Sequence, residues 1–318
     1  MGYTSEIAAA QMAAAQMAAA QTAAAQTTAA QTAAAQTAAA QAAATQTTAT
    51  QMAAAQTTAT QTTPTRTAAA CCAIGVMAKA PRAGFSKTRL CPPLRPDQAA
   101  HLSAAFLRDI TENIAQAARH TKLAGFVAYA PEGQEALFDG HLAAGTGLLL
   151  ADGSPLMPPD VQGFGRCLLH AILAMLARGH GSAVVLNSDS PTLPTAVLVR
   201  TAAALAAPGD RIVLGPAEDG GYYLLGMKAA HAHLFADIAW STESVAATTR
   251  TRAAQLGLEV VELPPWYDVD DQAALTRLLR DTTTPQMCNG LLPYAAPFTA
   301  AALQRMTLRE QGVDFAAE

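Results

Sequence analysis

The sequence predicts an α/β protein in which a mostly parallel sheet lies between helices, and two observations carry this prediction. From residue 73 onward, short apolar runs alternate with longer segments whose apolar residues recur at steps of three and four. Strand and helix signals that alternate in this way are typical of a layered α/β domain. The residues before position 72 show neither signal, and we expect them to form a low-complexity tail.

Seven apolar runs are the expected strands, and they cover residues 73–78, 123–130, 148–151, 183–187, 211–215, 222–227 and 258–263. Apolar periodicity predicts helices over residues 96–119, 166–178, 194–206, 242–256, 271–280 and 299–310. The first helix has the clearest signal, because Pro96 opens it and Leu102 and Phe106 recur on one face. We expect a folded domain over 72–285 and a C-terminal helical extension over 286–318.

The tail over 1–71 repeats five-residue units such as QMAAA and QTAAA, and it carries no charged residue between Glu6 and Arg66. A glutamine at every fifth position drifts around a helix and marks no face. Threonine, which becomes more frequent toward Thr63, weakens the helical preference of alanine. We expect a disordered tail or a frayed helix that buries no core, with self-association or partner binding as the alternative.

Composition excludes several classes of protein. The formal net charge of −4 leaves no basic footprint for nucleic acid. Glutamine interrupts the apolar tracts of the tail, which argues against a membrane span, and no basic segment precedes a compact apolar stretch as in a signal peptide. The five cysteines form no C-x-x-C pair, and their odd number fits no disulfide framework. We therefore expect a cytoplasmic protein with free thiols and no zinc site.

A basic loop follows the first expected strand. It carries Lys79, Arg82, Lys87 and Arg89, and Gly84 bends the chain between them. Cations this close repel one another unless an anion is present, and phosphate oxygens match ammonium, guanidinium and backbone N–H groups. The loop therefore predicts a phosphate site, with a solvated basic loop as the alternative.

An aspartate follows the fourth expected strand. Asp189 stands between Ser188 and Ser190, directly beyond the apolar run 183–187. Ligands of open α/β sheets bind beyond the carboxyl ends of the strands. Mg²⁺ is commonly held there by one or two carboxylates and shared with substrate phosphates. Asp189 is thus a candidate metal ligand, and a turn aspartate that binds local N–H groups is the alternative.

A second acidic motif joins two expected strands. Asp219 precedes Gly220 and Gly221, and an apolar run begins at Tyr222. Glycines permit the backbone to approach a ligand closely, and tyrosine offers a ring and a hydroxyl group. A tight hairpin turn is the alternative, because Asp-Gly is a strong turn signal.

A third acidic motif follows the last expected strand. Either Asp270 or Asp271 is expected to cap the next helix, which leaves Asp268 as a spare carboxylate beside Trp266. A further candidate is Arg166, a cation near the start of an expected helix. The helix dipole disfavours a cation there unless an anion lies nearby.

Five segments in this order resemble the bacterial DUF2064 family, namely MAKAPRAGFSKTRL, LNSDSPTLP, LGPAEDGGYYLLGM, WSTESV and LPPWYDVDD. Members of that family are described as glycosyltransferases of the GT-A type, within the nucleotide-diphospho-sugar transferase superfamily. The resemblance covers residues 73–280 and nothing of the tail. A more distant likeness is to 2-phospho-lactate guanylyltransferase, which shares a K-x-R-L loop and a D-G-G segment.

The resemblance implies a Rossmann-like GT-A fold over 72–285 that binds a nucleotide together with Mg²⁺ or Mn²⁺. By motif, the nucleotide-binding residues would be Lys79, Gly84, Lys87, Thr88, Arg89, Gly220 and Gly221. The catalytic residues would be Asp189, Asp219 and Asp268, of which Asp189 and Asp268 would hold the metal. Arg166, Tyr222 and Trp266 would contact other parts of the substrate.

The chain departs from the family pattern at two places. A single acid, Asp189, stands where many GT-A glycosyltransferases carry an Asp-x-Asp pair. Segment 162–166 reads QGFGR and lacks both acids of the family's D-L-G-E-R-type segment. The second departure concerns how the substrate is handled around Arg166.

The motifs and the resemblance together predict a metal-dependent transferase that uses a nucleotide-activated donor, first of all a nucleotide sugar, and a small-molecule acceptor. The alternative is a nucleotidylyltransferase that joins NMP from an NTP to a phosphorylated acceptor. A non-catalytic nucleotide-binding protein is the third hypothesis, and the altered segment 162–166 motivates it.

Overall fold

A seven-stranded sheet organises the computed structural model, which describes residues 71–310. The expected tail over 1–71 thus lies almost wholly outside the described residues. The strands are β1 (Cys72–Ala78), β2 (Leu123–Tyr129), β3 (Gly147–Leu150), β4 (Ser182–Asn187), β5 (Arg211–Pro216), β6 (Tyr222–Met227) and β7 (Glu259–Glu262), in the order β3-β2-β1-β4-β6-β5-β7. Within residues 71–310, β6 is the only strand antiparallel to its neighbours.

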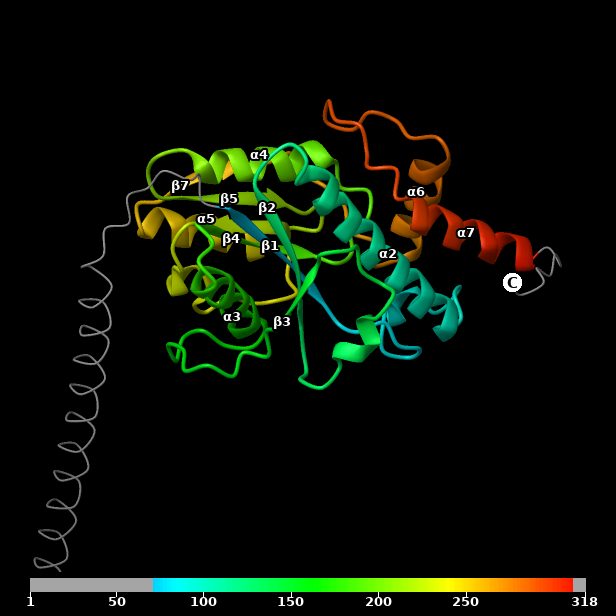
Figure 1. Ribbon diagram of the computed structural model, residues 1–318, viewed down its shortest axis with the longest axis horizontal. Helices are drawn as coiled ribbons and strands as arrows, with labels where there is room; N and C mark the ends of the chain where they lie inside the picture. The colour runs from blue at the N-terminus through cyan, green and yellow to red at the C-terminus, as the bar shows by residue number, and fades with distance from the viewer. Residues whose placement is uncertain (1–70, 311–318) are drawn as a thin grey trace, which may run out of the picture. The chain divides into compact units, whose positions relative to one another are not determined.

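Helices cover both faces of this sheet (Figure 1). They are α2 (Pro96–Ala117), α3 (Phe164–Ala177), α4 (Thr195–Ala206), α5 (Val245–Gln255), α6 (Gln272–Thr283) and α7 (Pro297–Glu310). Helices α2, α4, α6 and α7 contribute to one core, and α3 and α5 contribute to the other. Successive strand residues alternate between these cores, so Ile74 packs into the first and Ala73 into the second.

The predicted mostly parallel α/β fold is confirmed, and every expected strand and helix is present. The largest differences are the start of α5, at Val245 rather than at 242, and the end of α6, at Thr283 rather than at 280. Residues before α5 form a turn in which Ser241 has φ 64°, and the Ala246 N–H binds the Gly220 carbonyl. The short helical turns η1 (Thr88–Leu90), η2 (Glu135–Phe138) and η3 (Ala232–Phe235) were not expected.

The antiparallel direction of β6 follows from its connection to β5. Residues 217–221 are too few for the crossover that a parallel neighbour needs, so the chain reverses in a hairpin. Because β6 is antiparallel to both β4 and β5, β5 runs in the same direction as β4 and β1, and the hairpin turn after β5 lies at the edge where β1 and β4 also end. This edge gathers the motifs that the sequence singled out.

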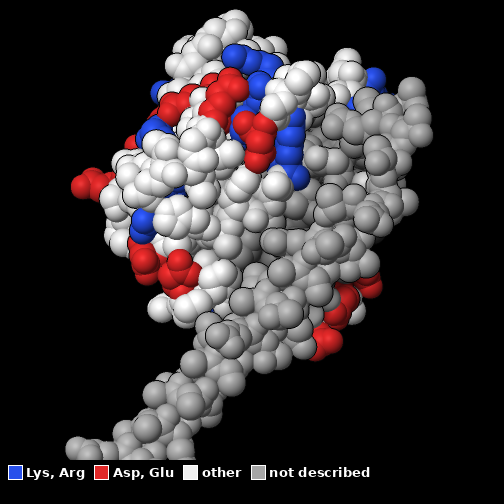
Figure 2. All heavy atoms as spheres, turned by 90° about the vertical axis from the view of Figure 1, so that its left-hand side faces the viewer, with Lys and Arg blue, Asp and Glu red and all other residues white. Residues whose placement is uncertain are grey.

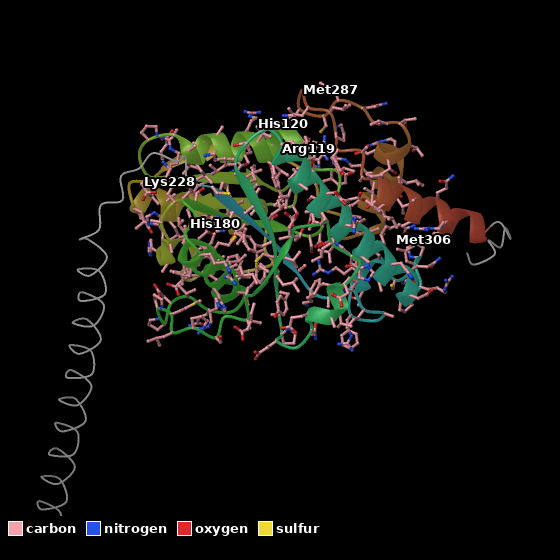
Figure 3. The ribbon with its side chains drawn as sticks, viewed as in Figure 1. Arg119, His120, His180, Lys228, Met287 and Met306 are labelled. Atoms are coloured by element: carbon pink, nitrogen blue, oxygen red, sulfur yellow. The ribbon has the colours of Figure 1, made fainter. Side chains whose placement is uncertain are left out.

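The other end of the sheet, where the parallel strands begin, carries a different set of side chains. Arg119 and His120 follow α2, His180 precedes β4, and Lys228 follows β6 (Figure 3). At the lateral edge, Glu259 of β7 pairs with Arg211, whose Nη2 lies 3.1 Å from Glu259 Oε2. Charged side chains on an edge strand oppose pairing with another sheet. Acidic and basic side chains also lie next to one another on the face shown in Figure 2.

Helix α7 is tied to α2 by a buried carboxylate. Asp109 of α2 is fully buried and accepts hydrogen bonds from the N–H groups of Phe298 (3.1 Å) and Thr299 (2.6 Å). These are N–H groups of the first turn of α7, which have no partner within the helix. Leu303 of α7 adds apolar contact with the same core. The packing of this C-terminal helix could not be assigned from sequence.

No helix in residues 71–310 is long and apolar enough to cross a membrane.

Replacement of Asp109 by alanine is expected to lower the free energy of unfolding by about 2 kcal/mol, because two buried N–H groups lose their acceptor. Urea denaturation measures the change. The control is Asp139→Ala at an exposed position after η2, for which a change below about 0.5 kcal/mol is expected. Equal effects of the two substitutions would contradict the capping role of Asp109.

Candidate active site at the carboxyl ends of the strands

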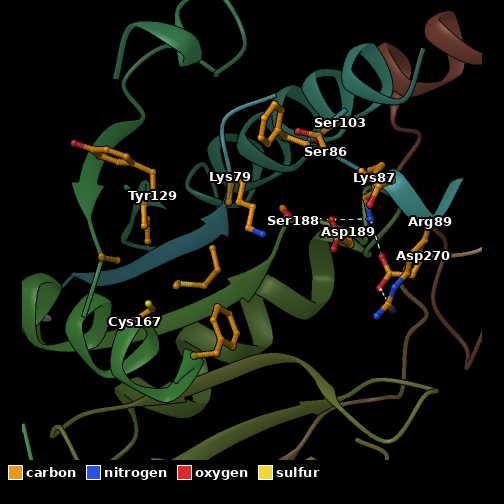
Figure 4. Close-up of a pocket in the computed structure, with 18 residues that line it drawn as sticks. Lys79, Ser86, Lys87, Arg89, Ser103, Tyr129, Cys167, Ser188, Asp189 and Asp270 are labelled. Atoms are coloured by element: carbon orange, nitrogen blue, oxygen red, sulfur yellow. Dashed lines mark hydrogen bonds and ion pairs between the residues drawn. The ribbon is translucent and has the colours of Figure 1, made fainter. Parts of the chain in front are cut away.

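A pocket of about 410 Å³ opens where β1, β2 and β4 end (Figure 4). Its walls come from these strand ends, from the basic loop after β1, from α2 and α3, and from the loop before α6. The lining residues that carry polar or charged side chains are Lys79, Ser86, Lys87, Thr88, Arg89, Ser103, Tyr129, Cys167, Ser188, Asp189 and Asp270. The pocket therefore brings together two of the motifs found in the sequence.

Lys87 is the most constrained charge of the pocket. Its side chain is only 7% exposed, and its Nζ lies 2.8 Å from Asp189 Oδ1 and 3.0 Å from Asp270 Oδ1. The ammonium group also donates to the Val269 carbonyl at 2.7 Å. Burial pulls the pKa of Lys87 down, but the two carboxylates outweigh it and hold that pKa above its ordinary value. Lys87 is therefore a permanent cation.

The local backbone aims Lys87 at these partners. Its φ of 51° is in the left-handed region, which a non-glycine residue seldom adopts, and it stands directly before the turn η1. Upstream, Gly84 has φ 77° and lets the chain bend so that the N–H groups of Phe85 and Ser86 bind the Arg82 carbonyl. The Ser86 hydroxyl in turn donates to the Ala80 carbonyl at 3.2 Å.

The other cations of the basic loop are more open. The Lys79 side chain is exposed and extends into the pocket (Figure 4). Unlike Lys87 and Arg89, it forms no ion pair with any residue in 71–310. Arg89 is 77% exposed, with Nη1 3.7 Å from Asp270 Oδ2. The predicted mutual repulsion of the loop is thus relieved in part by the protein's own carboxylates, and Lys79 keeps its charge available for a ligand.

Asp189 links two loops as well as binding Lys87. Its Oδ1 accepts a hydrogen bond from the Ser188 hydroxyl at 3.0 Å, and its backbone carbonyl accepts the Val269 N–H at 2.9 Å. The Ser190 hydroxyl donates to the Tyr267 carbonyl at 2.8 Å. These hydrogen bonds connect the turn after β4 to the loop that carries Asp268 and Asp270.

Asp270 is a site residue that the sequence did not single out. The sequence left the capping of α6 open between Asp270 and Asp271, and the structure gives it to Asp271, whose Oδ1 accepts the Ala274 N–H at 2.8 Å. Asp270 is thereby free to bind Lys87 and Arg89. The capping spacing did not separate the two aspartates, because Asp270 and Asp271 each lie three residues before an alanine N–H.

Asp268 is a half-buried carboxyl group whose pKa is well above its ordinary value. Burial, together with the neighbouring carboxylates of Asp270, Asp219 and Asp189, raises this pKa to about 6. The four acids therefore approach one another, although Asp219 and Asp268 do not line the pocket. Within residues 71–310, no group of three or more His, Cys, Asp or Glu residues is arranged to hold a metal ion. Two carboxylates completed by substrate phosphates remain a fitting set for Mg²⁺.

The Asp219-Gly220-Gly221 segment forms the turn of the β5–β6 hairpin, so the structural alternative is correct for it. Asp219 Oδ1 accepts the Gly221 N–H at 2.8 Å. Gly220 has φ 90°, and a Cβ there would lie 2.2 Å from the Glu243 carbonyl oxygen. Because Gly220 has no side chain, the backbone at Glu243, just before α5, can pack directly against the hairpin turn. Neither glycine lines the pocket, so their assignment to the nucleotide stays a prediction.

Trp266 does not line the pocket, and its expected substrate contact stays a prediction. The side chain is 1% exposed, and its ring stacks on Tyr267 in the core at a centroid distance of 5.9 Å. The buried hydroxyl of Tyr222 has no hydrogen-bond partner within residues 71–310, its pKa is raised by burial, and its ring contacts that of Trp240. Burial of this kind cannot be read from a short aromatic motif.

Arg166 is engaged by the loop after β3. Its guanidinium donates to the carbonyl oxygens of Gly153 (2.8 and 3.1 Å) and Pro155 (3.0 Å). These oxygens take the place of the anion that a cation near the start of a helix requires. Arg166 does not line the pocket, so a substrate contact there stays a prediction.

A protein-family model matches residues 113–242, and the family is described as "Uncharacterized protein conserved in bacteria (DUF2064)". This match confirms the resemblance that the sequence motifs indicated. The matched residues include Asp189 and the hairpin turn, and they exclude the basic loop and Asp268. No curated protein sequence matches the chain.

Solved structures share the fold. The crystal structure of a "putative nucleotide-diphospho-sugar transferase" from Desulfovibrio desulfuricans G20 matches with a TM-score of 0.59 and 23% identity, covering 77% of this chain and 99% of that chain. A cytidylyltransferase from Leptospira borgpetersenii serovar Hardjo-bovis matches with a TM-score of 0.42 and 10% identity, over 78% of this chain and 98% of that chain. Rv0371c from Mycobacterium tuberculosis H37Rv, in complex with manganese, matches with a TM-score of 0.38 and 21% identity, over 66% of this chain and 99% of that chain. The last two carry no weight at these TM-scores.

Replacement of Lys87 by methionine is expected to lower the free energy of unfolding by about 1–3 kcal/mol, because Asp189 and Asp270 lose their shared partner. Urea denaturation at neutral pH measures the loss. Arg89→Met is the matched control, since Arg89 is 77% exposed, and it should change the stability by less than about 0.5 kcal/mol. A loss no greater for Lys87 than for Arg89 would count against the ion-pair arrangement.

Replacement of Asp268 by asparagine is expected to stabilise the metal-free protein above pH 6. A folded pKa of about 6 exceeds the ordinary value near 3.9, so the wild type loses stability as pH rises from about 4 to about 6. The variant lacks this loss, and the partial exposure of Asp268 limits its gain to about 1–2 kcal/mol.

The measurement for Asp268→Asn is a series of thermal unfolding curves with EDTA, from pH 4.5 to pH 8. The difference in Tm between variant and wild type should grow through this range and level off near pH 7. A difference that does not vary with pH would show that Asp268 has an ordinary pKa.

Proposed function

We propose that this protein is a divalent-metal-dependent transferase that uses a nucleotide-activated donor, specifically a nucleotide sugar. One observation carries the proposal. A single pocket at the carboxyl ends of the strands joins an exposed Lys79, which forms no ion pair within residues 71–310, to the ion-paired cluster of Lys87, Asp189 and Asp270. The shared fold with the Desulfovibrio protein, whose printed name is that of a nucleotide-diphospho-sugar transferase, supports this class.

The basic loop would bind the phosphates of the donor. Lys79 extends into the pocket and Arg89 stands exposed at its rim, so both can move onto an anion. Lys87 is fixed by Asp189 and Asp270 and holds its proton, so it adds a permanent positive field. A preorganised cation such as Lys87 stabilises the charge that develops on a departing diphosphate without any rearrangement of its own.

A divalent ion would be held by Asp189 and Asp268. Burial and the neighbouring carboxylates of Asp270, Asp219 and Asp189 raise the pKa of Asp268, and a bound cation would offset both effects. A bound Mg²⁺ or Mn²⁺ would supply Lewis-acid stabilisation of the phosphate oxygens. Asp219, the other acid near Asp268, would then lie on the acceptor side, where it could orient a hydroxyl group.

Nucleotidyl transfer is the second candidate function, and one observation favours it. Lys79, Lys87 and Arg89 come from one loop beside a single strand-end acid, and three cations match a triphosphate as well as they match a diphosphate. In that reaction an NTP would give its NMP to a phosphorylated acceptor, and pyrophosphate would leave.

Incubation of the full chain with Mg²⁺ or Mn²⁺, a donor panel and an acceptor panel tests the proposal. Release of a nucleoside diphosphate from a nucleotide sugar supports glycosyl transfer, and release of pyrophosphate from an NTP supports nucleotidyl transfer instead. Tight nucleotide binding without turnover on any acceptor would favour the non-catalytic hypothesis.

Asp189→Asn and Asp268→Asn are each expected to lower turnover about 100-fold or more, because each removes a charged ligand of the metal. The matched control is Asp210→Asn, an aspartate that directly precedes β5 at the opposite edge and pairs with His231. Product formation under saturating metal measures the effect. Full turnover by Asp189→Asn would rule out its role in metal binding.

A further inference from the structure

Phe164 is an apolar residue in an unusual place. It is the first residue of α3 and lines the pocket of the candidate site, yet its side chain stays 49% exposed. Burial of a phenylalanine ring is favourable, so an exposed ring on a pocket wall leaves a surface that a ligand can cover. Neither the metal site nor the basic loop makes use of this ring.

Trp240 braces the ring of Phe164. The two rings meet edge to face with centroids 5.7 Å apart at 90°, and Trp240 meets Tyr222 at 6.5 Å and 82°. Gly165 makes this contact possible, because a Cβ there would lie 3.0 Å from Trp240 Cζ2. The ring is thus held in place before any ligand arrives, which reduces the entropic cost of binding.

The pocket separates charge from apolar surface. Its cations come from the loop after β1, and its acids come from the end of β4 and the loop before α6. Apolar lining comes from Met77, Ala128 and Ala151, which face the same side of the sheet as α3 and its Phe164. A ligand with both an anionic group and a flat, uncharged ring would match both kinds of surface.

We propose that Phe164 stacks on the nucleobase of the nucleotide whose phosphates the basic loop binds. This inference rests on the proposed function and adds to it the residue that holds the base. Stacking on an aromatic ring tolerates every base, because each base has a π-face. Phe164 therefore provides preference for nucleotides over inorganic phosphates, and other groups choose among the bases.

Phe85 is the other exposed phenylalanine of the pocket, and it is the less suitable platform. It is 65% exposed and belongs to the basic loop. Its ring lies 4.5 Å from the guanidinium carbon of Arg82, which is itself an exposed side chain. Phe164 begins a helix and is braced by a second aromatic ring, so its position is better defined than that of Phe85.

The test is isothermal titration of the full chain with ADP, CDP, GDP, UDP and inorganic pyrophosphate, each in the presence of Mg²⁺. Phe164→Ala should weaken the tightest nucleoside diphosphate about tenfold and change pyrophosphate binding less than twofold. Phe164→Trp should restore the nucleotide affinity. Phe298→Ala, at a position of α7 that is 42% exposed and outside this pocket, is the matched control and should change neither.

The outcomes separate this inference from the proposed function. If the wild type binds a nucleoside diphosphate and Phe164→Ala binds it equally well, the stacking role is wrong and the proposed function stands. An equal loss of nucleotide and pyrophosphate affinity, or a nucleotide-specific loss confined to Phe85→Ala, would also overturn it. If the wild type binds pyrophosphate but no nucleotide, both the function and the stacking role fail.

Discussion

The candidate site depends on the buried ion pairs of one ammonium group. Lys87, from the loop after β1, lies between Asp189 at the end of β4 and Asp270 before α6, at 2.8 and 3.0 Å. These three segments are distant in the sequence, and the shared charge holds them together. With only 7% of its side chain exposed, Lys87 stays charged because two carboxylates offset its lost hydration. The left-handed backbone at Lys87 serves this contact.

Helix α2 connects this cluster to the rest of the fold. Phe106 of α2 lies beneath Lys87, with Nζ 5.6 Å from the ring centroid, which adds a cation–π contact to the ion pairs. Ser103, one turn earlier, lines the pocket, and Asp109, one turn later, caps α7. A single helix therefore supports the site on one side and anchors the C-terminal helix on the other.

The acids at this edge are divided into two kinds by their partners. Asp189 and Asp270 are paired with Lys87, whereas Asp268 has no such partner within residues 71–310, and burial together with the nearby carboxylates raises its pKa to about 6. The hairpin brings Asp219 into the same region because β6 must return beside β5. Several carboxylates thus lie next to one fixed cation, which is the charge arrangement on which the proposed metal and phosphate binding rests.

The sequence by itself determined the strands, the helices and the edge at which the site lies. Periodicity is a local property, and the topology of parallel strands then places Asp189 and the basic loop at one edge. Only the tertiary structure decided which side chains meet there. It gave the helix cap to Asp271 and the ion pair to Asp270, buried Trp266 in the core, and set Gly220 against Glu243. These outcomes depend on packing between segments far apart in the chain, which no local pattern records.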